Sequence, residues 1–472
     1  MNQTKTSLNP FVLCLASLIT TALSPPTSHA NAPAPNIILF LADDMGWTGT
    51  SVAMDPSIPE SRSDFYQTPN LERLAAAGAR FSRAYAPAPL CTPSRAAILT
   101  GITPAELHMT TPGGGRTRPF HRLAQPAITR ELPTQLVSIP KALETCDYRS
   151  AHFGKWHVGQ TSPGEYGFAA HDGPNGNEGP REPQGPKDMD GITEKALAFI
   201  EEQHSRGRPF YLHLSHYAVH TPIESRPSTF EQFDSRPPGS QHNRIDYGAM
   251  THDLDSALGR ILDQLDALKI RDQTYVVFYS DNGAQGNRRR PENHPLQAGK
   301  GTLYEGGIRV PLVIRGPDIQ SGSVIDVPVT GIDLLPTFLA WARATNVPLL
   351  EGESLVPLLV HGPAPQWRDR PLLFHYPHYG QSPIQRPQSA LILGDYKLLH
   401  DIESGESRLF NLEEDIGEIR DLATSNPEKH AELRALLEQR LKEVGAQSMS
   451  PNPRFDPSFT PRQPRFGQRR PR

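Results

Sequence analysis

Apolar and polar positions alternate in blocks along this chain. The apolar run at 36–42 ends at two aspartates, which is typical of a buried parallel strand. Further strands are expected at 149–156, 210–215, 274–280 and 310–314. Stretches with helical periodicity and capping residues lie between them, at 69–77, 139–145, 192–204, 247–268 and 334–345. This alternation predicts an α/β fold, in which a mostly parallel, mixed sheet is sandwiched by helices.

The pattern changes after about residue 365. Short apolar segments with turn residues between them predict strands at 372–376, 390–400 and 408–412, and a helix is expected at 427–444. We therefore expect a large domain at 31–360 and a smaller C-terminal domain at 365–445, built from an antiparallel sheet and a helix. Residues 446–472 are rich in proline and arginine and poor in apolar residues, which predicts a disordered basic tail.

The N-terminus has the pattern of a secretory signal peptide at 1–30. Lys5 precedes an apolar run at 11–23, and Ser28 and Ala30 supply small residues before a cleavage site. A membrane anchor is the alternative, but this run is shorter than the roughly 20 residues that span a bilayer. No later segment is long and apolar enough to cross a membrane. The pattern predicts an exported protein, periplasmic or secreted.

Composition narrows the classes of function. The chain has 472 residues, of which 37% are hydrophobic, and its formal net charge is −4. A chain so near neutrality lacks the basic field of a nucleic-acid-binding protein, and no nucleic-acid partner is expected. It contains three cysteines, and Cys14 lies in the predicted signal peptide, so the remainder is not a disulfide scaffold. Cys146 ends an apolar helical pattern and is expected to be a small buried residue.

Cys91 needs another explanation. It begins the string Cys91-Thr92-Pro93-Ser94-Arg95, in which threonine and proline suit the first turn of a helix and Gly101 can end it. The free N–H groups of a helix N-terminus favour an anion. A thiol at such a position can also be a reactive cysteine in its own right.

The string C-x-P-S-R, followed by L-T-G at 99–101, resembles the formylglycine signature of the type I sulfatases in the alkaline phosphatase superfamily. The resemblance covers 36–316 and continues more loosely to about 445. In its overall sequence pattern the chain is similar to bacterial carbohydrate sulfatases and arylsulfatase A-like enzymes. The family's other motifs follow in order, at Asp43-Asp44, Gly154-Lys155-Trp156-His157, His220-Thr221-Pro222, Asp281-Asn282-Gly283 and the glycine-rich stretch around Lys300.

This resemblance implies hydrolysis of sulfate esters. A formylglycine-generating enzyme would oxidise Cys91 to formylglycine (3-oxoalanine), whose hydrated aldehyde attacks sulfur. The implied metal ligands are Asp43, Asp44, Cys91, Asp281 and Asn282. Carboxylate and amide oxygens suit Ca²⁺, or Mg²⁺ as the alternative, rather than zinc.

The resemblance also assigns roles to five other side chains. Arg95, Lys155 and Lys300 supply countercharge to the sulfate oxygens. His157 and His220 carry protons. Lys155, His220 and Lys300 are the expected substrate-binding residues. His375 and His378 can either reach the site from the second domain or serve local packing.

Three alternatives remain open. A phosphatase or phosphodiesterase of the same superfamily would use Ser or Thr and two zinc ions, and would have histidine where Asn282 stands. A phosphonate monoester hydrolase would keep the formylglycine. A catalytically silent glycan-binding protein would keep only the fold. The segment 213–222 is most similar to bacterial carbohydrate sulfatases, so a sulfated carbohydrate is the expected substrate.

Overall fold

The computed structural model describes residues 33–113, 117–177, 185–285, 292–345 and 350–459. The predicted signal peptide at 1–30 lies outside these residues. Within the described chain, no helix is both long enough and apolar enough to cross a membrane. The strands are β1 (Asn36–Ala42), β2 (Ala79–Phe81), β3 (Ala84–Tyr85), β4 (Leu123–Ala124), β5 (Arg149–Gly154), β6 (Ala170–His171), β7 (Phe210–Ser215), β8 (Thr274–Ser280), β9 (Leu312–Arg315), β10 (Ser323–Ile325), β11 (Val329–Thr330), β12 (Leu372–Tyr376), β13 (Gln388–Leu393), β14 (Tyr396–Asp401), β15 (Ser407–Asn411) and β16 (Ser450–Pro451).

A central sheet of eight strands has the order β10-β2-β9-β8-β1-β7-β5-β6. Its middle strand, β1, runs parallel to both β8 and β7, and β5 runs parallel to β7 and β6. Strand β9 is antiparallel to β8 and to β2. The expected mostly parallel, mixed sheet is therefore confirmed.

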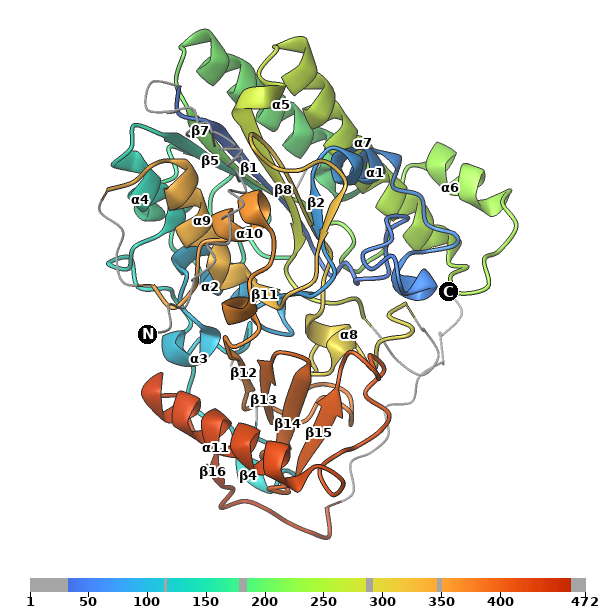
Figure 1. Ribbon diagram of the computed structural model, residues 1–472, viewed down its shortest axis with the longest axis vertical. Coiled ribbons are helices and arrows are strands. Elements are labelled where there is room, and N and C mark those ends of the chain that lie inside the picture. Colours follow the sequence, from blue (N-terminus) through green and yellow to red (C-terminus); the bar gives the residue numbers. More distant parts are fainter. Residues whose placement is uncertain (1–32, 114–116, 178–184, 286–291, 346–349, 460–472) are drawn as a thin grey trace, which may run out of the picture. The chain divides into compact units, whose positions relative to one another are not determined.

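Helices cover both faces of this sheet (Figure 1). Alternate residues of β1 point to opposite faces, so Ile37 and Leu39 belong to one buried cluster and Ile38 and Phe40 to the other. Helices α1, α5 and α7 pack on the Ile38 face, and α4 and α9 pack on the Ile37 face. The helices are α1 (Pro69–Ala76), α2 (Cys91–Thr100), α3 (Pro104–Leu107), α4 (Ile139–Glu144), α5 (Met189–Ser205), α6 (Pro227–Asp234), α7 (Ile245–Ala267), α8 (Glu305–Ile308), α9 (Leu334–Trp341), α10 (Val356–His361) and α11 (Pro427–Glu443).

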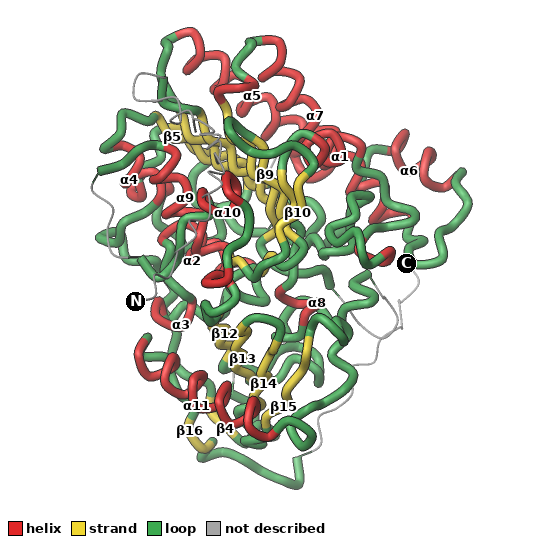
Figure 2. The backbone as a smooth tube through the Cα atoms, in the orientation of Figure 1, coloured by secondary structure: helices red, strands yellow, loops and turns green. Residues whose placement is uncertain are grey.

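Strands β12 to β15 form a separate antiparallel sheet (Figure 2). Helix α11 covers one face, where Leu433 and Leu437 pack against Leu398. The other face packs against residues of the first part of the chain, including Ile308. The chain from Ala34 onward forms one compact unit, which contains both sheets.

Two expectations for the C-terminal part were wrong. Residues 390–400 form two strands, because a tight turn at Gly394, with φ of 58°, reverses the chain between β13 and β14. Residues 446–459 are ordered, because β16 pairs with β4 and the Asn452 side chain donates hydrogen bonds to the carbonyls of Arg118 and His121. The rest of the predicted tail, 460–472, lies outside the described residues. Cys146 is only partly buried.

The parallel strands bring their carboxyl ends to one edge of the sheet, where α/β folds place their ligand sites. Strand β1 ends just before Asp43, and its neighbour β8 ends just before Asp281. Lys155 follows the end of β5, and the segment to His220 follows β7. The topology thus brings four distant sequence motifs to one place.

Candidate active site

Three aspartates and one asparagine form the base of the site. Asp43, Asp281 and Asn282 are fully buried, and Asp44 is nearly so. Asp44 adopts a left-handed backbone conformation, with φ of 62°, which lets two adjacent aspartates face the same point. Its N–H donates to Oδ1 of Asp281 (3.1 Å), and Nδ2 of Asn282 donates to its Oδ1 (2.7 Å).

Cys91 is the first residue of α2 and points at these carboxylates. Its Sγ lies 3.5 Å from Oδ1 of Asp43, 3.8 Å from Oδ1 of Asp44 and 3.3 Å from Nζ of Lys300. The turn before the helix is held by Ser94, whose hydroxyl accepts from the N–H of Ala88 and donates to its carbonyl. Burial raises the pKa of the Cys91 thiol to about 12, although Lys155 and Lys300 oppose the shift. The unmodified side chain is therefore a protonated thiol at neutral pH rather than a thiolate nucleophile.

The donor set fits a hard divalent cation. One ligand atom from each of Asp43, Asp44, Cys91 and Asp281 lies within 4.8 Å of the others. Oδ1 of Asn282 is buried and has no hydrogen-bond partner among the described residues. Rotating this amide by 180° would present its oxygen beside Asp44. Carboxylate and amide oxygens are the ligands that Ca²⁺ and Mg²⁺ prefer.

Three cations neutralise the three aspartates. Nζ of Lys155, whose side chain is fully buried, lies 2.5 Å from Oδ2 of Asp43, and Nζ of Lys300 lies 2.5 Å from Oδ1 of Asp44. Nη2 of Arg95 lies 2.7 Å from Oδ2 of Asp281. Burial alone would raise the pKa of Asp43, but Lys155 and Arg95 outweigh it and hold this pKa below its usual value.

The contacts of Arg95 differ from those of Lys155 and Lys300. Its Nε and Nη2 contact Asp281, and its Nη1 donates to the carbonyl of Lys155 (2.7 Å). Its guanidinium therefore holds a metal-ligating carboxylate and the segment of Lys155, whereas Lys300 keeps 11% of its side chain exposed. The countercharge to sulfate that the sequence interpretation assigns to Arg95 stays a prediction.

His157 is buried beside the lysines. Its N–H donates to the carbonyl of Asn175 (2.8 Å), and its own carbonyl accepts from the Thr92 hydroxyl (2.8 Å). Burial, reinforced by Lys155 and Arg95, lowers the pKa of His157 to about 2. The imidazole is therefore neutral at neutral pH.

Asn175 is a supporting residue that the sequence interpretation missed. Its Oδ1 accepts from the N–H of Trp156 and its Nδ2 donates to the carbonyl of Gly154, both within 2.9 Å. These bonds fix the loop that carries Lys155 and His157. A lone asparagine in a glycine- and proline-rich stretch carries no sequence signal for this role.

His220 stands at the more open side of the site. Its Nδ1 lies 2.6 Å from the carbonyl of Thr221, so Nδ1 carries a proton and Nε2 is left to face Asp44 at 3.9 Å. Burial lowers the pKa of His220, against the pull of Asp43 and Asp44. The side chain is 13% exposed, so Nε2 can meet a substrate.

His375 and His378 do not reach the site. Nε2 of His378 contacts the Thr110 hydroxyl (2.7 Å) and its Nδ1 contacts Gln125 (3.1 Å). His375 contacts the Ser389 hydroxyl and the carbonyl of Gln447. Both ring nitrogens of each histidine are thus used in local packing, the second of the two interpretations left open by the sequence.

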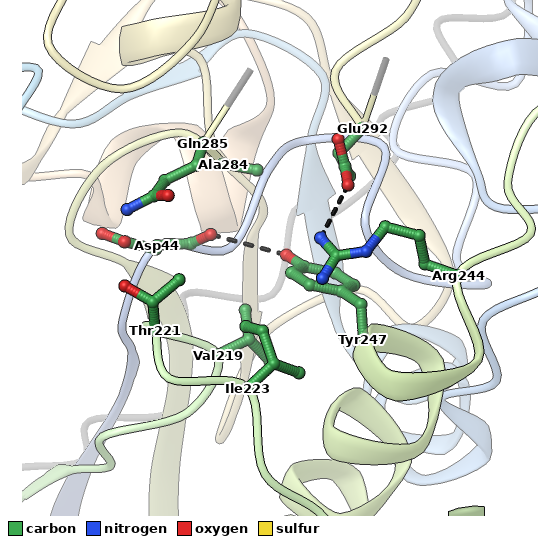
Figure 3. Close-up of a pocket in the computed structure, with 9 residues that line it drawn as sticks. All are labelled: Asp44, Val219, Thr221, Ile223, Arg244, Tyr247, Ala284, Gln285 and Glu292. Carbon is green, nitrogen blue, oxygen red and sulfur yellow. Dashed lines mark hydrogen bonds and ion pairs between the residues drawn. The ribbon is translucent and has the colours of Figure 1, made fainter. Parts of the chain in front are cut away.

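A narrow pocket opens on the Asp44 side of the site (Figure 3). Thr221 and Gln285 point toward Asp44, and Tyr247 closes the far side with its hydroxyl 3.5 Å from the carbonyl of Asp44. Arg244 pairs there with Glu292 (2.7 Å). Polar groups therefore line the space next to the buried carboxylates, and the sequence motifs did not identify them.

Comparison with known proteins agrees with this geometry. Residues 35–344 match the family model described as Sulfatase, and residues 298–447 match that described as N-sulphoglucosamine sulphohydrolase, C-terminal. The chain is 31% identical to N-acetylgalactosamine-6-sulfatase of Canis lupus familiaris, in an alignment covering 73% of this chain and 69% of the relative. It is also 31% identical to arylsulfatase A of Homo sapiens, with 74% and 72% covered.

Solved structures share the fold. The crystal structure of Ps i-CgsB in complex with k-i-k-neocarrahexaose has a TM-score of 0.73 and 26% identity, and the match covers 90% of this chain and 94% of that one. The phosphonate monoester hydrolase of Agrobacterium radiobacter, at 18% identity and a TM-score of 0.64 over 87% of this chain and 95% of that one, shares the fold alone. Since the first family model spans more than half of the sequence, the chain belongs to the sulfatase family and is a sulfuric ester hydrolase.

Proposed function

We propose that this sulfatase removes O-sulfate from a sulfated carbohydrate, with Cys91 oxidised to formylglycine and one divalent cation, Ca²⁺ or alternatively Mg²⁺. The observation that carries the proposal is the position of Cys91, whose Sγ lies within 4 Å of two aspartates and of Lys300 at the start of a helix. Asp43, Asp44, residue 91, Asp281 and Asn282 would hold the cation.

The two absent groups would supply an activated hydroxyl at residue 91 and positive charge beside it. The chain's own residues then have distinct tasks. The ammonium groups of Lys155 and Lys300 face the point where sulfate oxygens would lie and stabilise their charge. Arg95 and the backbone around Asp44 keep the carboxylates converging on that point.

Protons move through the two histidines. His220 bonds a carbonyl through Nδ1, so its Nε2 carries a proton only in the imidazolium form. Burial disfavours this form and lowers the pKa, while Asp43 and Asp44 favour it. In that form Nε2 donates to the leaving alcohol. His157 is neutral, and its carbonyl accepts from the hydroxyl of Thr92, the residue after 91, so we assign to His157 the second proton transfer at residue 91.

A carbohydrate substrate is favoured by the relatives. The names of two similar proteins refer to an N-acetylgalactosamine sulfate and to a neocarrahexaose complex. Beside Asp44, the pocket also presents polar groups, from Thr221 and Gln285, next to the apolar Val219 and Ile223. Aryl sulfates and phosphonate monoesters are the competing substrates.

Sulfate release from a panel of sulfated mono- and oligosaccharides tests the proposal. The protein is coexpressed with a formylglycine-generating enzyme, and mass spectrometry first confirms an aldehyde at residue 91. We expect release from at least one sugar, and none from Cys91→Ala or after chelation. Release only from nitrophenyl sulfate, or hydrolysis only of a phenylphosphonate ester, would remove the carbohydrate proposal.

We also propose export, with a signal peptide at 1–30 and a periplasmic or secreted mature enzyme. The sequence pattern of that segment is the support for this proposal. N-terminal sequencing of the protein from its native host tests it. A mature chain beginning near residue 31 is expected, and a cell-associated chain that retains Met1 would contradict export.

A further inference from the structure

A second buried charge cluster lies between the two sheets. Lys397, on β14, is fully buried, and its Nζ contacts Oε1 of Glu305 (2.9 Å) and Oε1 of Glu418 (2.8 Å). Both carboxylates are also buried. A lysine in such a position requires partners of opposite charge, because desolvation of an unpaired ammonium is costly.

The other side chains of this cluster, Tyr85 and Arg309, contact Glu305. Oε2 of Glu305 accepts from the Tyr85 hydroxyl (3.0 Å) and pairs with Nη1 of Arg309 (3.3 Å). Oε2 of Glu418 accepts from the backbone N–H of Glu305 (2.7 Å). Two cations thus face two carboxylates. Without Lys397, the two glutamates would keep one cation between them, and Oε1 of Glu418 would lose its partner.

Glu305 is the first residue of α8, and this short helix touches three parts of the active site. The carbonyl of Gly307 accepts from the N–H of Gly283, which follows the predicted ligand Asn282 (3.0 Å). The carbonyl of Ile308 accepts from the N–H of Ala86, in the segment that leads to Cys91 (2.7 Å).

The third connection is to Gln297, three residues before Lys300 in the same segment. The N–H of Gly306 donates to the carbonyl of Gln297 (2.9 Å), and the N–H of Lys300 donates to the carbonyl of Ala284 (3.0 Å). A displacement of α8 would therefore be passed to the metal-binding loop and to the lysine beside the sulfate position.

We propose that Lys397 is a positioning residue for the sulfatase site, which fixes α8 and with it Lys300 and Asn282 by neutralising Glu305 and Glu418. This inference rests on the proposed function for its kinetic readout. Lys397 itself lies in the second sheet and contacts neither Cys91 nor the metal-binding aspartates. The C-terminal sheet is thereby tied to catalysis through one buried side chain.

The test compares charge-balanced and unbalanced variants. Lys397→Met keeps the length of the side chain and removes its charge, and we expect kcat to fall about tenfold while KM changes less than about threefold. Lys397→Met combined with Glu418→Gln restores neutrality and should recover most of kcat. Asp395→Asn is the matched control, because Asp395 lies two residues away and pairs with Arg83 without a described contact to α8.

Hydrogen exchange gives a second readout that does not depend on substrate. Amides at 300–309 should exchange faster in Lys397→Met than in the wild type, and more slowly again in the double variant, while Asp395→Asn leaves them unchanged. Unchanged exchange and kcat in Lys397→Met, or no recovery in the double variant, would overturn the inference. If the wild type releases no sulfate, the proposed function fails, and the exchange pattern alone then decides the role of Lys397.

Discussion

Two buried charge clusters in this molecule use the same residue types and differ in their access to solvent. Around Cys91, three aspartates meet two lysines and an arginine, and Lys300 and His220 reach the surface. Around Lys397, two glutamates pair with a lysine and an arginine, and all four side chains are buried from solvent.

The clusters also differ in what remains unsatisfied. In the first, Oδ1 of Asn282 has no partner among the described residues, and carboxylate oxygens converge on one point. In the second, the carboxylate oxygens do not converge on one point: each lies next to a cation, a hydroxyl or an N–H, although Oε1 of Glu418 pairs with Lys397 without forming a hydrogen bond. A buried cluster of charged side chains therefore does not by itself indicate a catalytic site. Carboxylate oxygens that converge on one point, next to side chains that reach the surface, do indicate one.

The largest expected loss of activity comes from removing one of the carboxylates that would bind the cation. Asp281→Ala should lower kcat/KM about a thousandfold, because both the cation and Arg95 lose their partner. Wild-type protein should melt at a higher temperature in Ca²⁺, and Asp281→Ala should not. Asp395→Asn, which removes a partner of Arg83 away from the cation site, should retain the Ca²⁺-dependent shift. A shift that persists in Asp281→Ala would contradict the assigned cation site.

A second prediction concerns His220 at the exposed edge. His220→Ala should lower kcat about a hundredfold on a sugar sulfate, because the poor leaving group needs a proton. The loss on nitrophenyl sulfate should be clearly smaller, since nitrophenolate leaves without one. The ratio of the two kcat values is the measurement, and His378→Ala serves as the control. Equal losses on both substrates would argue against proton donation.

A smaller effect is expected at Asn175. Asn175→Ala should lower kcat about tenfold, because the loop with Lys155 and His157 loses two hydrogen bonds. Asn175→Asp keeps the acceptor for Trp156 and should fall between the wild type and the alanine variant. Steady-state kinetics of the three proteins check this order, and a fully active alanine variant would remove Asn175 from the list of positioning residues.

The smallest effect is on stability in the cluster around Lys397. Burial raises the pKa of Glu418 to about 7, against the pull of Lys397, whereas an unfolded glutamate titrates near about 4.3. Between these two values the folded chain holds a proton that the unfolded chain releases, so the free energy of unfolding falls as pH rises. Urea unfolding across this window should show the slope in the wild type and a weaker one in Glu418→Gln. An identical slope in both would show that Glu418 does not titrate there.

The sequence predicted the strands whose carboxyl ends build the site, because β1 and β8 are continuous apolar runs that end in polar pairs. It also named Cys91, Asp43-Asp44, Asp281-Asn282 and Lys300, since their motifs are local. It could not identify Lys397, Glu418 or Asn175, because each acts through partners that are distant in sequence or through backbone atoms. The turn at Gly394 was missed because apolar residues flank it on both sides, and β16 because short polar strands carry no periodicity.

The burial of Cys91 determines whether oxidation of this residue comes before or after folding. In the folded protein this side chain is only 2% exposed, so a second enzyme cannot take it into its own active site. Oxidation at residue 91, as proposed, must therefore happen while this region is still unfolded. Under the proposal, a chain that folds before this oxidation keeps a buried thiol at residue 91 and lacks the nucleophile.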